Sequence, residues 1–438
     1  MALKVCKFGG TSMADGNIMK AVKKIISSDA ARRFVVVSAP GMRFSGDSKI
    51  TDLLYICYDE LEHTGACKTS FTLIRNRFTG IVKELNLDMD IKSVLDETEV
   101  RIVKESSRDF TASRGEYITA RIMAKLLDAQ FIDSEDVVFF DEHGGLDADA
   151  TYKAIAKAVS GVKTAVFPGF YGVDRQGKVK TFTRGGSDVS GAIVARAVGA
   201  GLYENWTDVS GFLACDPRIV DRPKQIRALS YKELRELSYM GANVLHSESI
   251  FPVRKANIPI VIKNTFRPDD EGTTILPISQ YKPSGNVVTG IAGKKNFVVI
   301  QIEKSNMNNE VGIVRRVLTI LESEGVSVEH IPSGIDTMSI VFEAEQAPGY
   351  KLERILEGIK DAAEPEVIRV MENVALIATV GHGMSSSIGT SARLFKAMAA
   401  ANVNVKMIDQ GSSELNIIVG VKNEDCDKCI AAIYHEFF

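Results

Sequence analysis

Short apolar segments that end at glycine or proline clusters alternate with amphipathic stretches through the first part of the chain. Leu3–Phe8 ends at Gly9-Gly10, and Phe34–Ser38 ends at Pro40-Gly41. Runs of this kind are typical of strands buried on both faces, and the stretches between them carry apolar residues at helical spacing. Because parallel strands need crossover helices, this alternation predicts an α/β fold, an αβα sandwich with a mainly parallel sheet.

The strands and helices of this sandwich can be assigned from their patterns. The expected strands are Leu3–Phe8, Phe34–Ser38, Val137–Phe140, Thr164–Phe167 and Ile258–Ile262. The expected helices are Asn17–Ile26, Leu53–Leu61, Phe71–Leu85, Glu116–Leu127 and Val189–Val198. In open α/β sheets ligands bind at the carboxyl ends of the strands, so the glycine and hydroxyl clusters found there form the candidate site.

The pattern changes near residues 272–286, where Pro277, Pro283 and Gly285 indicate a boundary. After this boundary the order strand, helix, strand, strand occurs twice, which predicts tandem ferredoxin-like (βαββαβ) domains. Gly325 and Asn402 stand where the two repeat helices should end. The first copy is Phe297–Glu303, Gly312–Ser323, Val326–His330 and Met338–Phe342, and the second is Val374–Val380, Gly389–Ala401, Val403–Met407 and Leu415–Val419.

Bulk composition argues against several classes of protein. A formal net charge of -3 gives no electrostatic reason to expect nucleic acid or an anionic membrane as a partner. No apolar run reaches the roughly 20 residues that span a bilayer, and the first residues lack the pattern of a secretory signal. The scattered cysteines do not form a disulfide framework, so we expect a cytoplasmic protein with reduced thiols. Cys426 and Cys429 lack two further metal ligands and are expected to be apolar residues of a C-terminal helix.

The segment Lys7-Phe8-Gly9-Gly10-Thr11-Ser12 follows the first strand directly. Paired glycines let successive N–H groups face one point, which suits phosphate oxygens, and the following helix adds its positive N-terminal end. Lys7 supplies a full positive charge. The alternative is a tight turn with a surface lysine, because the glycine spacings of the P-loop and of dinucleotide-binding folds are absent.

Two further segments carry groups that suit a substrate with charged ends. In Thr183–Asp188, Arg184 can clamp a carboxylate with two hydrogen bonds, whereas Ser187 and Asp188 also stand where helix caps stand. Glu116 lies near the start of an expected helix, where it can hold an ammonium group or simply favour the helix dipole.

Charged groups also follow the later strands. Asp208 comes just past an apolar segment, and Asp216 and Arg218 follow in a turn, which fits contacts to a nucleotide or Mg²⁺. Asp-Pro pairs also start ordinary turns, so this signal is weak alone. Lys263 ends the last strand of the sandwich and is expected at the same sheet edge as Lys7.

In this combination and order, the motifs resemble those of aspartate kinases over essentially the whole chain. They are Lys7–Ser12, Ser38–Gly41 with Thr51-Asp52-Leu53, Arg114-Gly115-Glu116, Arg184–Asp188 and Thr207-Asp208. The resemblance implies an amino-acid kinase fold over 1–280, one ACT domain over 297–370 and a second ACT domain over 287–296 plus 371–438. It also implies transfer of the γ-phosphoryl group of ATP, with Mg²⁺, to the side-chain carboxylate of L-aspartate.

The resemblance carries the family's functional residues over to positions of this sequence. The implied catalytic residues are Lys7, Asp188 and Lys263. The implied aspartate-binding residues are Ser38, Thr51, Glu116, Arg184 and Ser187. The implied ATP-binding residues are Lys7, Phe8, Gly9, Gly10, Thr207, Asp208, Leu213, Asp216, Arg218, Lys263 and Asn264. Leu213 stands where the family often has an aromatic residue, so Phe212 is the alternative for stacking on adenine, and no protein metal ligand is assigned.

The paired ACT domains resemble a feedback sensor for an amino acid, with lysine favoured and threonine possible. The resemblance implies that the enzyme catalyses the first step of a biosynthetic route, where such feedback acts. The resemblance implies a homodimer or a dimer of dimers through these domains. The candidate effector-binding residues are Met307, Gly312, Glu329 and Ser333. For Glu329 the alternative is a solvated surface acid.

A carboxylate nucleophile with a pKa of about 3.9 is already ionised at neutral pH and needs no general base, and no histidine lies in any of the motifs. The rival readings are a kinase for glutamate or carbamate and an amino-acid-binding regulator without catalysis. The repeats and the Thr51 segment argue against the first, and the presence of Lys7, Arg184 and Asp208 argues against the second. A fused homoserine dehydrogenase is not expected at this length.

Overall fold

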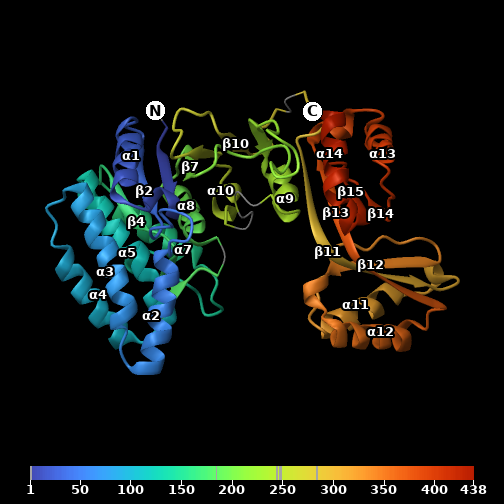
Figure 1. Cartoon of the computed structure of the whole chain (residues 1–438), viewed down its shortest axis with the longest axis horizontal. Coiled ribbons are helices and arrows are strands. Elements are labelled where there is room, and N and C mark those ends of the chain that lie inside the picture. Colours follow the sequence, from blue (N-terminus) through green and yellow to red (C-terminus); the bar gives the residue numbers. More distant parts are fainter. Residues whose placement is uncertain (1, 184, 243–244, 246–248, 283–284) are drawn as a thin grey trace. The chain divides into compact units, whose positions relative to one another are not determined.

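The computed structural model describes residues 2–183, 185–242, 245, 249–282 and 285–438. The chain forms two compact units, each described here by itself (Figure 1). The first unit spans residues up to 212 together with 227–231 and 243–282. The second spans 213–226, 232–242 and 283–438.

The first unit is built on an eight-stranded sheet in the order β3-β4-β2-β1-β7-β9-β10-β8. Neighbouring strands are parallel except for β9 and β10, so the predicted mainly parallel α/β sandwich is confirmed. The strands are β1 Lys4–Phe8, β2 Arg32–Val37, β3 Gln130–Phe131, β4 Ala165–Pro168, β7 Leu202–Thr207, β8 Ala228–Ser230, β9 Ile260–Asn264 and β10 Thr273–Leu276. A separate hairpin pairs β5 Tyr171–Val173 with β6 Val179–Thr181.

Helices cover both faces of this sheet (Figure 1). Side chains alternate along a strand, so Cys6, Phe8 and Trp206 join the core beneath α1, while Lys7 and Asn205 point to the other side, beneath α8. We call these sides the α1 face and the α8 face. The helices are α1 Gly16–Ser27, α2 Ile50–Thr64, α3 Lys68–Leu85, α4 Ile91–Glu105, α5 Arg108–Leu127, α6 Ser134–Val137, α7 Ala148–Ala158, α8 Gly186–Ala197 and α10 Phe251–Lys255.

The second unit contains a five-stranded antiparallel sheet in the order β12-β11-β13-β15-β14. Its two longest strands, β11 and β13, pair with each other from Gly290 through Glu303 of β11. Each of them therefore crosses both halves of the sheet, the half that holds β12 and the half that holds β14 and β15. The strands are β11 Gly290–Glu303, β12 Thr337–Glu343, β13 Val367–Val380, β14 Met407–Asp409 and β15 Asn416–Lys422. The helices are α9 Tyr231–Tyr239, most of which lies in this unit, α11 Ile313–Ser323, α12 Gly349–Ala363, α13 Thr390–Ala400 and α14 Cys426–Phe437.

Four expectations about local structure are wrong. Val403–Met407 is not a strand, because residues 403–406 are irregular and β14 begins only at Met407. Val137–Phe140 is not a strand, because the carboxylate of Asp133 caps the short helix α6, and Phe139 and Phe140 form only isolated bridges. Val326–His330 likewise contributes a single bridge, from His330 to Val341. Glu116 does not lie at the start of a helix: Ser107 caps α5 at its start, so Glu116 lies in the helix interior and cannot serve the dipole of the first turn.

Other features agree with the sequence. Gly325 and Asn402 adopt positive φ after α11 and α13, as expected for residues that end helices. Cys426 and Cys429 are buried in α14 and carry free thiols. Among the described residues, no helix combines the length and the apolar character needed to cross a membrane.

Candidate active site

The turn after β1 is fixed by backbone contacts at the carboxyl ends of the central strands. The N–H of Gly9 donates to the carbonyl of Trp206 at 3.0 Å, and the N–H of Gly41 donates to the carbonyl of Gly10 at 2.8 Å. The amide of Gly9 is therefore committed to the sheet, and a phosphate must take its hydrogen bonds from amides later in the turn. The two glycine segments that sequence analysis identified separately are in direct contact.

Gly41 has no room for a side chain. A Cβ at this position would lie 2.8 Å from the carbonyl carbon of Gly10 and 2.9 Å from its oxygen. Gly41→Ala is therefore expected to displace the turn of residues 9–13, called the phosphate turn below for the role that its sequence predicts, and to lower kcat/KM by about 10-fold or more, measured by steady-state kinetics. Gly80→Ala in α3, where a Cβ would meet nothing within 4 Å, is the matched control and should keep full activity. Wild-type kinetics for Gly41→Ala would contradict the proposed tight contact.

Lys7 is the charged centre of the site. Its side chain is 9% exposed, and its Nζ lies 2.5 Å from Oδ1 of Asp188 in the first turn of α8. Asn205 of β7 donates to the same carboxylate oxygen at 3.0 Å. Asp188 thus positions the ammonium group of Lys7, and Asn205 holds Asp188. Sequence analysis missed Asn205, although an amide within an otherwise apolar buried strand is a usable signal.

The serines predicted to bind substrate meet beside this ion pair. The hydroxyl oxygens of Ser38, just past β2, and Ser187, in α8, are 2.5 Å apart, and both side chains are buried. Thr51 lies in the first turn of α2 and is half-buried. Arg184 lies outside the described residues, so its predicted contact with a carboxylate stays a prediction.

Glu116 is the buried acid of the site. It is 5% exposed, and its Oε2 has no hydrogen-bond partner among the described residues. Burial raises the pKa of Glu116 to about 7, although the amide of Ala39 and the charge of Lys7 partly oppose this rise. A buried carboxyl with an unpaired oxygen is well suited to receive a positively charged group.

Lys263 does not join Lys7. In the strand register Lys7 pairs with Asn205, whereas Lys263 pairs with Trp206, so the two lysine side chains leave the sheet on opposite faces. Lys263 donates to the carbonyl of Asp270 and lies 5.7 Å from the Trp206 ring centroid, and burial lowers its pKa. The predicted contact of Lys263 with the nucleotide therefore stays a prediction, and it would have to come from the other face of the sheet than that of Lys7.

The other predicted nucleotide residues of the first unit lie at the ends of β7 and β9. Asn264 donates to the carbonyl of Asp208 at 3.2 Å and to the hydroxyl of Ser210 at 3.0 Å. The hydroxyl of Thr207 donates to the carboxylate of Asp208 at 3.1 Å, and Asp208 is exposed to solvent. Phe8 lies in the core of the α1 face, so only its backbone can contact a nucleotide.

Leu213, Asp216 and Arg218 belong to the second unit. Arg218 donates to the carboxylate of Asp216 at 2.6 Å, and Leu213 is partly exposed. Phe212 is only 1% exposed, so its ring is not available as the alternative surface for adenine.

The predicted effector residues lie around the start of α11 and in the segment before β12. Gly312 precedes α11 with φ of +84°, Met307 is buried and Ser333 is exposed. Glu329 is not simply solvated, because it accepts a hydrogen bond from the hydroxyl of Tyr239 in α9.

The acidic groups do not form a metal site by themselves. Within the described ranges, no group of three His, Cys, Asp or Glu side chains could hold a metal ion. A divalent ion in this site would therefore depend on phosphate oxygens of a bound nucleotide for most of its ligands.

Comparison with known proteins shows how widely this architecture is shared. The profile of the amino acid kinase family matches residues 2–264, and a profile of ACT domains matches residues 377–437. Aspartokinase 3 of Bacillus subtilis is 37% identical over 450 residues, which cover 100% of this chain and 99% of that protein. The crystal structure of Clostridium acetobutylicum aspartate kinase matches with 51% identity and a TM-score of 0.91, with 100% of both chains covered.

Two structures of E. coli aspartokinase III also match over 100% of this chain. The R-state complex with aspartate and ADP has 26% identity and a TM-score of 0.78, with 100% of that chain covered. The T-state complex with lysine and aspartate has 25% identity and a TM-score of 0.74, with 99% covered. On the full-length match and the shared fold, this chain belongs to the amino acid kinase family and, within it, to the aspartokinases.

Proposed function

We propose that this protein transfers the γ-phosphoryl group of ATP to the side-chain carboxylate of L-aspartate at the carboxyl ends of β1 and β2. The observation that carries the proposal is the ion pair between Lys7 and Asp188, which stands beside the glycine turn and the Ser38–Ser187 contact. The complex of E. coli aspartokinase III with aspartate and ADP supports the choice of substrates.

The aspartate half of the site is assigned to the polar groups around Glu116. Its carboxyl receives the substrate ammonium group, and the hydroxyls of Ser38, Thr51 and Ser187 line the pocket. Arg184 holds a substrate carboxylate. The family's pattern supports this set, and the buried, unpaired oxygen of Glu116 supports its place in it.

The nucleotide half is assigned to the turn after β1 and to the ends of β7 and β9. Lys7 and the later amides of the turn neutralise the phosphates, and Thr207, Asp208 and Asn264 contact the nucleotide. The nucleotide contacts expected of Asp216 and Arg218 stay predictions. The nucleotide enters as its Mg²⁺ complex. Lys263 is not assigned to the phosphates, because its side chain leaves the sheet on the α1 face.

The chemistry requires alignment and charge neutralisation rather than proton transfer. The nucleophilic carboxylate is ionised at neutral pH, so no base has to activate it. An anion must approach a polyanionic phosphate in line, and the ammonium group of Lys7, a residue only 7% exposed, offsets that repulsion where water screens least. Asp188 keeps this ammonium group in position until the phosphates arrive.

A coupled assay of ADP release tests the proposal directly. The purified full chain should release ADP with L-aspartate and MgATP, and much less with L-glutamate or without an acceptor. Faster ADP release with glutamate or carbamate than with aspartate would show that aspartate is not the preferred substrate. No release with any acceptor, together with amino-acid binding in calorimetry, would replace catalysis with a sensor role.

The second unit is proposed to inhibit the kinase when an amino acid, most simply lysine, binds near α11 and Glu329. The lysine complex of E. coli aspartokinase III supports lysine over threonine. We further propose that the protein assembles as a homodimer or a dimer of dimers through the ACT domains.

Glu329→Gln should raise the lysine concentration for half-inhibition about 10-fold or more, because a neutral amide replaces the charged partner of the effector ammonium group. Uninhibited kcat should stay at its wild-type value. Inhibition curves with lysine and with threonine give the measurement, and unchanged inhibition by both would remove Glu329 from the effector site.

A further inference from the structure

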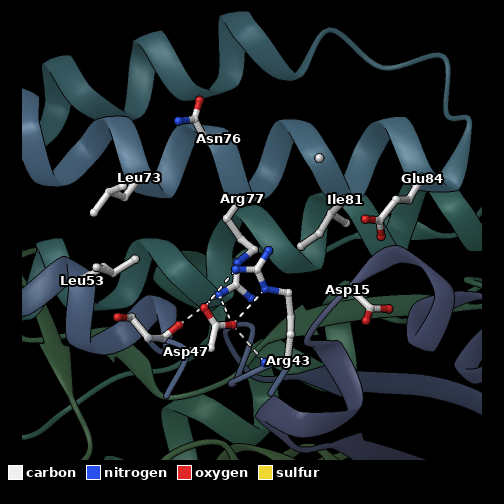
Figure 2. A pocket seen from close by; sticks show the side chains of 11 residues that line it. Asp15, Arg43, Asp47, Leu53, Leu73, Asn76, Arg77, Ile81 and Glu84 are labelled. Carbon is white, nitrogen blue, oxygen red and sulfur yellow. Dashed lines mark hydrogen bonds and ion pairs between the residues drawn. The ribbon is translucent and has the colours of Figure 1, made fainter. Parts of the chain in front are cut away.

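A cavity of about 280 Å³ lies between the start of α1, the segment 41–48 and helix α3 (Figure 2). Charged side chains line it, among them Arg43, Asp47 and Arg77. Arg77 is the buried member, at 8% exposure, and it stands on the apolar side of α3 between Ile74 and Ile81. A buried arginine among apolar helix residues needs specific partners to offset the loss of its hydration.

All four hydrogen bonds of Arg77 go to segments that lead into the proposed active site. Its Nη1 donates to the carbonyls of Ala14 at 3.2 Å and Gly41 at 3.3 Å. Its Nη2 donates to the carboxylate of Asp47 at 2.6 Å and to the carbonyl of Ser48 at 3.0 Å. The planar guanidinium group thus ties together three stretches of chain that are far apart in sequence.

Each of these stretches carries a part of the proposed site. Ala14 directly follows the turn Gly10–Met13, and Gly41 comes three residues after Ser38. Ser48 lies just before α2, which holds Thr51 in its first turn. Arg77 therefore connects the phosphate turn to both hydroxyl-bearing segments of the aspartate pocket.

The carboxylate of Asp47 is the charged partner of Arg77 in this arrangement. Arg43 donates to it through Nε at 2.8 Å and Nη2 at 2.9 Å, and Figure 2 shows both guanidinium groups converging on it. Hydrogen bonds from Arg43, with the nearby charge of Arg77, hold the pKa of Asp47 well below its usual range, while burial lowers the pKa of Arg77. One carboxylate shared by two guanidinium groups thus connects Arg43 and Asp47 of this segment to Arg77 of α3.

We propose that Arg77 is a positioning residue for phosphoryl transfer, which holds the phosphate turn and the aspartate-binding segments in register. This inference rests on the proposed function. Arg77 touches no reacting atom; it acts through Gly41, Ala14 and Ser48. Because both substrates depend on these segments, their relative placement is the property that Arg77 controls, and small misplacements of reacting groups cost large factors in rate.

The test compares Arg77→Met and Arg77→Lys with Arg75→Met. Arg75 lies two residues earlier on the same helix, and its ion pairs go to Asp96 and Glu99 of α4, away from the site. Arg77→Met should lower kcat/KM about 100-fold with both substrates affected, and Arg77→Lys should restore part of the loss. Arg75→Met should keep kcat and both KM values, whatever its melting temperature.

Chemical rescue of Arg77→Ala adds a measurement that a purely structural role of Arg77 would not change. Millimolar guanidinium ions should restore part of the activity of Arg77→Ala, because they can enter the adjoining cavity, and should not restore Lys7→Met. Wild-type kcat and KM values for Arg77→Met would overturn the inference.

Two further measurements cover other failures. If Arg77→Met does not fold, Asp47→Asn decides: it should raise the KM for aspartate and leave the KM for ATP unchanged, and unchanged kinetics would overturn the inference. If the wild type phosphorylates no acceptor, the proposed function fails. Calorimetry with ADP then decides about Arg77, because weaker ADP binding by Arg77→Met than by Arg75→Met supports its positioning role and equal binding overturns it.

Discussion

Lys7→Met is expected to lower kcat by about 10³-fold and to leave the KM for L-aspartate nearly unchanged. The ammonium group of Lys7 is almost fully buried and lies 2.5 Å from Asp188, so its position is fixed before the nucleotide binds. Its charge matters most when the anionic nucleophile and the phosphoryl group approach, which is a demand of the transition state rather than of aspartate binding. Steady-state kinetics with each substrate varied separately measures both constants.

Lys4→Met is the matched control for this substitution. Lys4 lies on the same strand and pairs with Asp29 at 2.8 Å and Glu204 at 3.3 Å, at the end of the strand away from the glycine turn. Its loss removes a lysine ion pair without touching the site, so kcat should stay close to that of the wild type. A loss of kcat shared equally by both variants would show that the charge of Lys7 has no special role.

Glu116→Gln is expected to weaken aspartate binding and, at the same time, to stabilise the protein in the absence of substrate. The amide keeps the shape of the carboxyl group but cannot pair with an ammonium group, so the KM for aspartate should rise roughly 10- to 100-fold. In the free wild-type enzyme, the buried carboxylate lacks a partner for Oε2 within the described structure. Replacing it with a neutral group removes the cost of a buried charge.

The pH dependence of this effect follows from the raised pKa of Glu116, which is about 7 in the folded protein and lower in the unfolded chain. Below the pKa of the unfolded chain, Glu116 is protonated in both the folded and the unfolded state, so its burial costs the folded protein no stability. Between that value and about pH 7, the unfolded chain gives up this proton while the folded protein still holds it, so the wild type loses stability across this range, and the loss reaches about 3 kcal/mol above pH 7. The variant should therefore match the wild type in stability at pH 4 and exceed it at pH 8.

Thermal unfolding with and without L-aspartate separates the two effects. At pH 8 the substrate should raise the melting temperature of the wild type and leave that of Glu116→Gln almost unchanged. The KM of the wild type should also rise as the pH falls below about 7, because the neutral carboxyl no longer attracts an ammonium group. A KM that does not depend on pH or on this substitution would remove Glu116 from the aspartate pocket.

The sequence allowed the architecture to be predicted because burial leaves a strong periodic signal. Apolar strands and the repeat of strand and helix order were visible without any knowledge of contacts, and the eight-stranded and five-stranded sheets agree with them. Short elements such as α6 were misassigned, because the cap at Asp133 outweighs the strand preference of the valines that follow.

The site was predicted in part, and the failures have a common cause. Lys7 and Asp188 come together as their motifs suggest, yet Lys263, one residue before the end of β9, points to the opposite face of the sheet. A position near the end of a strand predicts the edge of the sheet at which a residue lies. The face of the sheet to which its side chain points depends on the pairing register of the strands, which sequence alone does not give. Asn205 and Arg77 were missed for a related reason, since each acts by holding another residue and lies in no recognised motif.

The shared strands of the second unit also govern how its halves can come apart. β11 and β13 pair along 14 residues each, with one irregular stretch near Phe297, so the backbone of one half continues unbroken into the other. Removing either half by truncation would expose a long unpaired edge in what remains. Amides of both halves along these strands should accordingly exchange with deuterium in a single cooperative opening rather than in two.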